Sequence, residues 1–474
     1  MSLKARVAHN TIIQIAGKVI STVLGLFSIR VMADYLGPEG FGEYTTIITF
    51  LSFFAIIADL GLTLVTVSLI SRKEADEEKI LNNLFGLRFF SALVFLSAGP
   101  IIVFLFPYGS AIKAGVIVAS LSFFFAALNQ IFVGLFQKYL KMEKVSVAEV
   151  VGRVILLAGV IIAARAGAGL NGILLAAVVS AAANFFLLYI FSRRLARIRF
   201  GFDRGLWLEI IKKSWPLALT IFFNLLYLKT DTIILSLVRP LDEVGIYGAA
   251  YKVIDVLITI PFLFSGIILP ILALAWSERD REKFGRVLQK SFNLLAILAC
   301  PMTAGTFLIS KRVMGLVAGP EFTPAGEALN ILILASAAVF LGNIFAHAVI
   351  AVDRQKSIIP AYIFTAASSI IGYLIFIPRY SYFGAAWVTV YSETAIALFS
   401  FYIVYKTARF FPSLKVFFKS ALAAAIMYSL SLPFRDFNIF LLMPSAAVIY
   451  LFTLYLLKGI GKEDLSLLKL TKLS

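Results

Sequence analysis

Long runs of apolar residues, separated by short polar segments, occupy most of the chain between residues 11 and 457. A helix needs about 20 apolar residues to cross the hydrocarbon core of a bilayer. The runs are continuous rather than alternating, which excludes a transmembrane barrel of strands. The pattern therefore predicts an all-α polytopic membrane protein with fourteen transmembrane helices. The predicted spans are residues 11–36, 43–70, 81–106, 113–136, 148–165, 170–191, 213–238, 247–274, 287–310, 328–352, 358–377, 385–405, 416–433 and 438–457.

The composition agrees with this interpretation and excludes several classes of protein. Apolar residues make up 61% of the 474 residues and charged residues only 15%, and the mean hydropathy is +0.94. So few charges cannot cover a water-soluble surface, which excludes soluble enzymes, nucleic-acid-binding proteins and disordered regulators. One cysteine, Cys300, and two histidines, His9 and His347, are too few for a disulfide or a His-rich metal site. No cofactor is expected.

The distribution of Lys and Arg predicts the orientation. With the N-terminus inside, the inside segments carry 30 of the 43 basic residues, the outside segments carry 7 and the spans carry 6. This split follows the positive-inside rule and predicts a cell-membrane protein with both termini in the cytoplasm. Lys4 and Arg6 precede an apolar stretch without a small-residue cleavage pattern. We therefore expect that stretch to remain as the first span rather than to be removed as a signal.

Two short motifs recur along the chain. Gly-x-Tyr at residues 42–44 recurs at residues 245–247, an offset of 203, and the segment 171–173 resembles 383–385 at an offset of 212. These echoes place spans 1–6 and 7–12 in register as parallel repeats, which put a substrate path between the two halves. The predicted domains are an N-terminal six-helix bundle (1–191), a cytoplasmic amphipathic linker (192–212), a C-terminal six-helix bundle (213–405) and helices 13 and 14 with a cytoplasmic tail (406–474).

Six charged residues lie well inside predicted spans one, two, seven and eight: Arg30, Asp59, Lys229, Asp231, Lys252 and Asp255. A charge at mid-membrane costs about 2.5–3.5 kcal/mol on insertion scales, so these side chains must face water or one another. Helical spacing puts Asn224 on one face with Asp231, and Tyr251 on one face with Asp255, which favours a central cavity. Ion pairs within helices, Arg30 with Asp34 and Lys252 with Asp255, are the alternative explanation.

Other charges have a simpler interpretation. Glu149 and Arg153 are four residues apart in span five, and the spacing predicts a structural ion pair near the inner interface. Lys18 and Arg88 lie near inner span ends, where they either extend to the interface or line a basic inner vestibule.

Two ionisable residues stand alone at depth, Glu393 in span twelve and His347 in span ten, and each is a candidate proton or cation site. For His347, a packed, hydrogen-bonded role near Asn343 is the favoured interpretation. Glu74, Asp76, Glu77 and Glu78 give an inner loop acidic character, and either a synthase binds this loop or the loop is solvated.

The segment from Arg30 through residues 36–44 (LGPEGFGEY), followed by residues 59–62 (DLGL) and Ser71-Arg72, resembles the polysaccharide transporter family. These proteins are oligosaccharide-lipid flippases of the multidrug/oligosaccharidyl-lipid/polysaccharide exporter superfamily. Asp231, residues 244–247 and Tyr251-Lys252 resemble the seventh and eighth spans of that family. The resemblance covers about residues 10–405.

The resemblance implies a V-shaped pair of six-helix bundles with a central cationic cavity. It implies alternating access that moves an isoprenoid-diphosphate-linked oligosaccharide from the inner to the outer leaflet. Arg30 and Lys252 match the family's basic cavity positions, and such groups suit a diphosphate. Further substrate-binding candidates are Lys229, Asn224, Tyr251, Lys18 and Arg88; ion-coupling candidates, for H⁺ or Na⁺, are Asp59, Asp231, Asp255 and Glu393. The expected partners are a lipid-linked glycan and membrane lipids, with glycan-synthesis enzymes as an open addition, and the chain is expected to be a monomer.

Four other functions compete with this one. A cation-coupled multidrug exporter of the same superfamily would share the fold but prefer a negative cavity, and a peptidoglycan-precursor flippase would carry a similar diphosphate lipid. A membrane enzyme is disfavoured, because the outside loops are short and carry no Asp-x-Asp motif. An ATP-driven pump is disfavoured because the sequence has no Gly-x-x-x-x-Gly-Lys loop.

Overall fold

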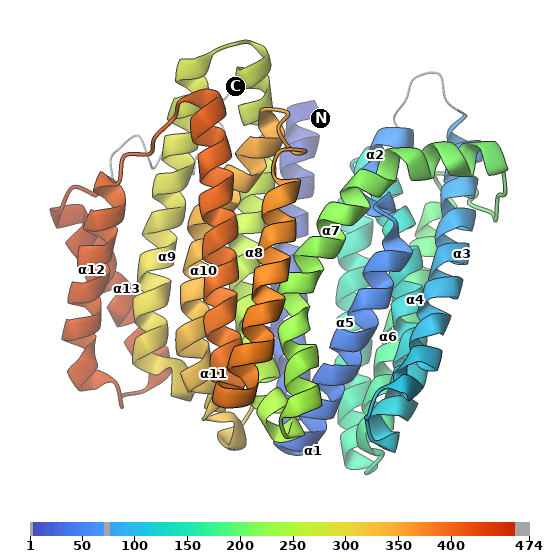
Figure 1. The fold of residues 1–474 in the computed structure, drawn as a ribbon, viewed down its shortest axis with the longest axis horizontal. Helices are drawn as coiled ribbons and strands as arrows, with labels where there is room; N and C mark the ends of the chain where they lie inside the picture. Colours follow the sequence, from blue (N-terminus) through green and yellow to red (C-terminus); the bar gives the residue numbers. More distant parts are fainter. Residues whose placement is uncertain (1–2, 71–75, 460–474) are drawn as a thin grey trace. The chain divides into compact units, whose positions relative to one another are not determined.

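The computed structural model describes residues 3–70 and 76–459, and every regular element in these residues is a helix (Figure 1). The contacts between residues divide the chain into two compact units. Unit 1 comprises residues 1–245 with 317–319, and unit 2 comprises 246–316 with 320–474. This division follows packing, so the predicted domain boundaries, which follow the repeat, stay a prediction.

The elements follow one another in chain order. Up to the linker they are α1 (Leu3–Asp59), α2 (Leu62–Ile70), α3 (Glu77–Ile102), η1 (Val103–Leu105), α4 (Ser110–Lys138), α5 (Met142–Arg165) and α6 (Gly169–Ser192). After it come α7 (Arg204–Val238), α8 (Leu241–Ser277), α9 (Arg281–Val317), η2 (Pro320–Phe322), α10 (Ala325–Ala351), α11 (Ile359–Ala408), α12 (Lys415–Ser431), η3 (Leu432–Phe434) and α13 (Ile439–Leu456).

Twelve of the described helices are long and apolar enough to cross a membrane, so the chain is a multi-pass membrane protein of the predicted all-helical class. The two longest, α1 and α11, are each interrupted by a residue with positive φ, Gly37 (65°) and Ser381 (52°). Gly37 tolerates this conformation, and Pro38 then suits the first turn of the next helix. α11 therefore covers two predicted spans almost completely, whereas α1 covers the first predicted span and only residues 43–59 of the second. The count of fourteen crossings and the V shape stay predictions.

Predicted span 43–70 is wrong as a continuous helix. The backbone leaves the helical conformation at Leu60 (φ 50°) and Gly61 (φ 73°), and α2 begins at Leu62. A side chain at residue 61 would place its Cβ 2.6 Å from the carbonyl oxygen of Ser214 in α7. Glycine is therefore required both by the left-handed conformation and by the close approach of α7.

The two glycines of the predicted repeat meet inside unit 1. A Cβ on Gly42 would overlap the carbonyl oxygen of Leu241, and a Cβ on Gly245 would overlap that of Pro38. Each built Cβ also lies close to the partner's backbone nitrogen, 3.1 Å for Gly42 and 3.0 Å for Gly245. Each glycine thus lies against the carbonyl group four residues before the other glycine. The two glycines are 203 residues apart, the same offset as in the sequence motif, and their backbone contacts are reciprocal.

The linker packs on α3 in unit 1. Asn82 accepts hydrogen bonds from the backbone nitrogen of Arg199 at 2.6 Å and, through its carbonyl, from that of Gly201 at 3.0 Å. Asp203 caps the N-terminus of α7, which then crosses the end of unit 1 before it turns along the bundle (Figure 1). The amphipathic part of the linker and the seventh span are therefore one helix.

In unit 2, the last two helices pack on α9 (Figure 1). Small residues of α12 and α13, such as Ala424 and Ala446, form a core with Ile297 and Ala304 of α9. A second core joins α8, α9, α10 and α11.

Candidate functional site

Asp59 and Arg88 form an ion pair between a half-buried carboxylate and a buried guanidinium in unit 1, at the break between α1 and α2. The Arg88 side chain is 1% exposed, and its Nη1 lies 2.5 Å from Asp59 Oδ1. Arg88 also donates to the carbonyl oxygens of Asp59 and Ala127, both at 3.0 Å, and to Thr63 Oγ1 at 2.7 Å. The guanidinium thus satisfies the last carbonyl group of α1 and also joins α1 to α4. Arg88 is a predicted substrate-binding residue, but all three of its guanidinium nitrogens donate to oxygen atoms of the protein.

Arg30 forms the pair with Asp34 that the spacing allowed, with 2.6 Å between Nη1 and Oδ1. Gly319, from the segment after α9, packs against both side chains with φ at 112°, and a Cβ there would lie 2.5 Å from Asp34 Oδ1. Arg30 is half-buried. The predicted substrate-binding residue Arg30 is therefore partly covered by the backbone at Gly319, which belongs to unit 1.

The predicted residues of α7 are engaged within the protein. Asp231 is fully buried, and its Oδ1 accepts from the backbone nitrogen of Thr232 at 2.5 Å and from its hydroxyl at 3.1 Å. Asn224 Nδ2 donates to the Tyr227 hydroxyl at 2.7 Å. Lys229 is half-buried and, like Asp231, has interactions beyond these.

In unit 2, two charged residues predicted to lie inside a span form no ion pair with a described residue. Lys252 and Asp255 of α8 are both half-buried, and neither forms an ion pair with any residue that the structure describes. The pair expected from their i,i+3 spacing is therefore absent among residues 3–70 and 76–459, so ion pairing within a helix accounts for Arg30 but not for Lys252 and Asp255. Tyr251, one residue before Lys252, lies 3.3 Å from Thr389 Oγ1 of α11 through its hydroxyl.

Glu393 and His347, the two isolated ionisable residues, also belong to unit 2. Glu393 is half-buried, forms no ion pair in the described part of the chain and interacts electrostatically with Tyr362. His347 Nδ1 lies 2.9 Å from the carbonyl oxygen of Asn343, which confirms the expected hydrogen bond. His347 therefore has a hydrogen bond within its own helix, whereas Glu393 has neither a hydrogen bond nor an ion pair with a described residue.

The predicted pair of Glu149 with Arg153 does not form. Lys18 of α1 instead approaches Glu149 of α5, with 3.3 Å between Nζ and Oε1. Arg153, at the middle of α5, has no ion pair or side-chain hydrogen bond with a described residue. Sequence reasoning missed Arg153 as a functional candidate, although the presence of two basic residues for one carboxylate was a signal.

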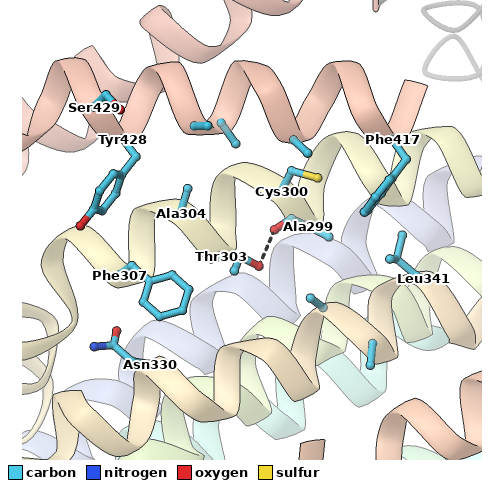
Figure 2. Close-up of a pocket in the computed structure, with 15 residues that line it drawn as sticks. Ala299, Cys300, Thr303, Ala304, Phe307, Asn330, Leu341, Phe417, Tyr428 and Ser429 are labelled. Atoms are coloured by element: carbon cyan, nitrogen blue, oxygen red, sulfur yellow. Dashed lines mark hydrogen bonds between the residues drawn. The ribbon is translucent and has the colours of Figure 1, made fainter. Parts of the chain in front are cut away.

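A cavity of about 760 Å³ opens in unit 2 between α9, α10 and α12 (Figure 2). Its walls are mostly apolar or small, and the Thr303 hydroxyl is satisfied by the carbonyl oxygen of Ala299 at 2.9 Å. Polar groups gather at one end of the cavity, where Asn330, Tyr428 and Ser429 lie (Figure 2). Such walls suit an alkyl chain rather than a charged head group.

The described residues hold no candidate metal site, and the predicted acidic loop is partly tied to neighbouring helices. Within residues 3–70 and 76–459, no group of three or more His, Cys, Asp and Glu side chains could hold a metal ion. In the acidic loop, Asp76 caps α3 and Glu77 lies 2.6 Å from Lys138. Glu74, Ser71 and Arg72 lie outside the described residues.

The fold and the charged spans define a multi-pass helical membrane protein. The family model described as "Polysaccharide biosynthesis protein" matches residues 7–276, and the MatE model matches residues 216–376. The chain belongs to the polysaccharide biosynthesis protein family, and the resemblance to the polysaccharide transporter family is confirmed.

Two curated relatives and one solved structure are similar to this chain. The chain is 24% identical over 229 residues to the probable flippase AglR of Haloferax volcanii, and 22% identical over 317 residues to the succinoglycan biosynthesis transport protein ExoT of Rhizobium meliloti. These matches cover 46% and 66% of this chain, and 46% and 62% of the two relatives. The lipid II flippase MurJ, in an inward closed conformation, has a similar fold, with a TM-score of 0.78, 16% identity and coverage of 96% and 99% of the two chains.

Proposed function

We propose that the protein is a flippase that moves an isoprenoid-diphosphate-linked oligosaccharide from the cytoplasmic to the outer leaflet by alternating access. The observation that carries the proposal is Lys252, an ammonium group inside α8 without an ion pair in the described part of the chain. Because an uncompensated charge inside a span is costly, such a group is retained where it binds a ligand or faces water. A diphosphate is the complementary ligand.

Two further observations support this proposal. The relatives AglR and ExoT are named as a probable flippase and as a biosynthesis transport protein, not as enzymes. The apolar cavity of unit 2, polar at one end, suits a long alkyl chain that ends in a polar head (Figure 2). A lipid carrier combines both chemistries in one substrate.

The test is transport in vesicles of known lipid composition. Purified protein is reconstituted with a fluorescent polyprenyl-diphosphate disaccharide, and translocation is measured by protection from a membrane-impermeant quencher. We expect Lys252→Gln to lower the rate at least about tenfold, because one charge-assisted contact to phosphate is lost. Lys356→Gln, at an exposed loop lysine of unit 2, is the matched control. Wild-type rates from Lys252→Gln would contradict the proposal.

A cation-coupled drug exporter is the second candidate, favoured by one observation. Asp255 and Glu393 give unit 2 two carboxylates without ion pairs among the described residues. Efflux of an organic cation dye from the same vesicles, without transport of the lipid probe, would support the exporter. A third probe, a polyprenyl-diphosphate muropeptide, separates a peptidoglycan-precursor flippase from one that carries other glycans.

A further inference from the structure

The inference concerns Arg153 of α5. Glu149 lies one helical turn before it, at the spacing that gives an ion pair on a single helix. Glu149 instead accepts from Lys18 of α1, and Arg153 has neither an ion pair nor a side-chain hydrogen bond with a described residue. Among the described residues, this guanidinium therefore has no counterion, and it lies in the inner third of predicted span 148–165.

The surroundings of Arg153 show which way it faces. A Cβ built on Gly25 of α1 would lie 3.8 Å from Arg153 Nη1, so no side chain of residue 25 covers the guanidinium. Arg153 also interacts electrostatically with Tyr44, in the second half of α1. The Arg153 side chain is half-buried. It therefore projects toward α1 within unit 1, where five N–H donors are available to a ligand.

We propose that Arg153 is a phosphate-binding residue of the transport path and that Lys18 and Glu149 are its positioning pair. The proposal rests on the proposed function and names a ligand for the diphosphate in unit 1. A planar guanidinium binds two phosphate oxygens at once, which an ammonium group cannot do. Lys18 neutralises Glu149 and so keeps that carboxylate from occupying the Arg153 donors.

The first experiment measures transport kinetics in the reconstituted vesicles with diphosphate-linked and monophosphate-linked polyprenyl disaccharides. We expect Arg153→Gln to raise the KM for the diphosphate probe about tenfold and to reduce the preference for diphosphate over monophosphate. Arg153→Lys, which keeps the charge but not the fork, is expected to lie in between. Arg165→Gln, at the exposed end of the same helix, is the matched control. A wild-type KM and preference in both Arg153 variants would overturn the inference.

The second experiment tests the positioning pair. In Lys18→Gln, Glu149 is free to pair with Arg153, so we expect the KM to rise several-fold; in the double variant Lys18→Gln/Glu149→Gln it should return toward the wild-type value. A double variant as impaired as Lys18→Gln would show that Lys18 does not act through Glu149. If the wild-type protein transports neither probe, the proposed function fails and the inference fails with it. If it transports the diphosphate probe and the Arg153 variants match it, only the inference fails.

Discussion

Unit 1 and unit 2 differ in how they hold charges inside their spans. In unit 1, Asp59 pairs with Arg88, Arg30 with Asp34, and Lys18 with Glu149. In unit 2, the span residues Lys252, Asp255 and Glu393 form no ion pairs within the described residues. A charge pair that closes a helix break is part of the structure, whereas an uncompensated charge is available to a substrate or a coupling ion. Arg153 departs from this pattern in unit 1, because it forms no ion pair with a described residue.

We expect the largest effect from a substitution that breaks the Asp59–Arg88 ion pair. Arg88→Gln leaves a half-buried carboxylate and two carbonyl oxygens without their donor, which should cost about 3–5 kcal/mol and abolish monodisperse protein in detergent. Lys252→Gln should leave the melting temperature unchanged, because the Lys252 ammonium group forms no ion pair with a described residue. Thermal unfolding followed by size-exclusion chromatography measures both.

The double variant Asp59→Asn/Arg88→Gln separates charge from hydrogen bonding. Because Arg88 also donates to Ala127 and Thr63, we expect only partial recovery. Equal melting temperatures for Arg88→Gln and Lys252→Gln would mean that the two units do not differ as described.

The glycines of α8 sharpen the same comparison within one helix. Gly245, in unit 1, touches the backbone of Pro38, whereas Gly266, in unit 2, has no atom within 4 Å of its built Cβ. Gly245→Ala should therefore destabilise the protein by about 1–3 kcal/mol through overpacking. Gly266→Ala should be neutral or slightly stabilising, because alanine is the better helix former.

Thermal unfolding is measured for the single variants Gly42→Ala, Gly245→Ala and Gly266→Ala and for the double variant Gly42→Ala/Gly245→Ala. Since Gly42 and Gly245 each lie against the other's backbone nitrogen, the double variant should lose less than the sum of its single variants. Strict additivity would argue against the shared contact.

The carboxylates of unit 2 should govern coupling rather than stability. With Asp59 paired and Asp231 engaged, Asp255 and Glu393 are the candidates for binding H⁺ or Na⁺. We expect Asp255→Asn or Glu393→Gln to abolish the stimulation of transport by an imposed ion gradient, with a severalfold loss of rate and an unchanged melting temperature. Full stimulation in both variants, or its loss only in Asp59→Asn, would reverse the assignment.

Much of the fold could be predicted, because a span needs only length and apolar composition, and eleven helices beside α1 meet that requirement. The break at Leu60 and Gly61 could not, since the apolar run continues through it and the reason for it is the approach of α7. The same limit applies to the site. Spacing on one helix suggested Glu149 with Arg153, but the partner of Glu149 comes from α1, 131 residues away. Charge position is readable from sequence, whereas charge pairing depends on tertiary packing.

The smallest expected effect concerns the linker on α3, outside the spans. Lys79 donates to Asp203, with 2.8 Å between Nζ and Oδ2, and this hydrogen bond holds the pKa of the carboxyl below its ordinary value of 3.8. Because the folded-state pKa is lowered, the stabilisation is present above the unfolded value and is lost as pH falls through the lowered pKa. The docked linker should therefore loosen only below about pH 4. Hydrogen exchange at the Gly201 amide, which donates to Asn82 at 3.0 Å, should then quicken by about two- to fivefold after correction for intrinsic rates. Asp203→Asn keeps the cap on α7 but removes the titration, so a pH dependence that survives in this variant would assign the loosening to another group.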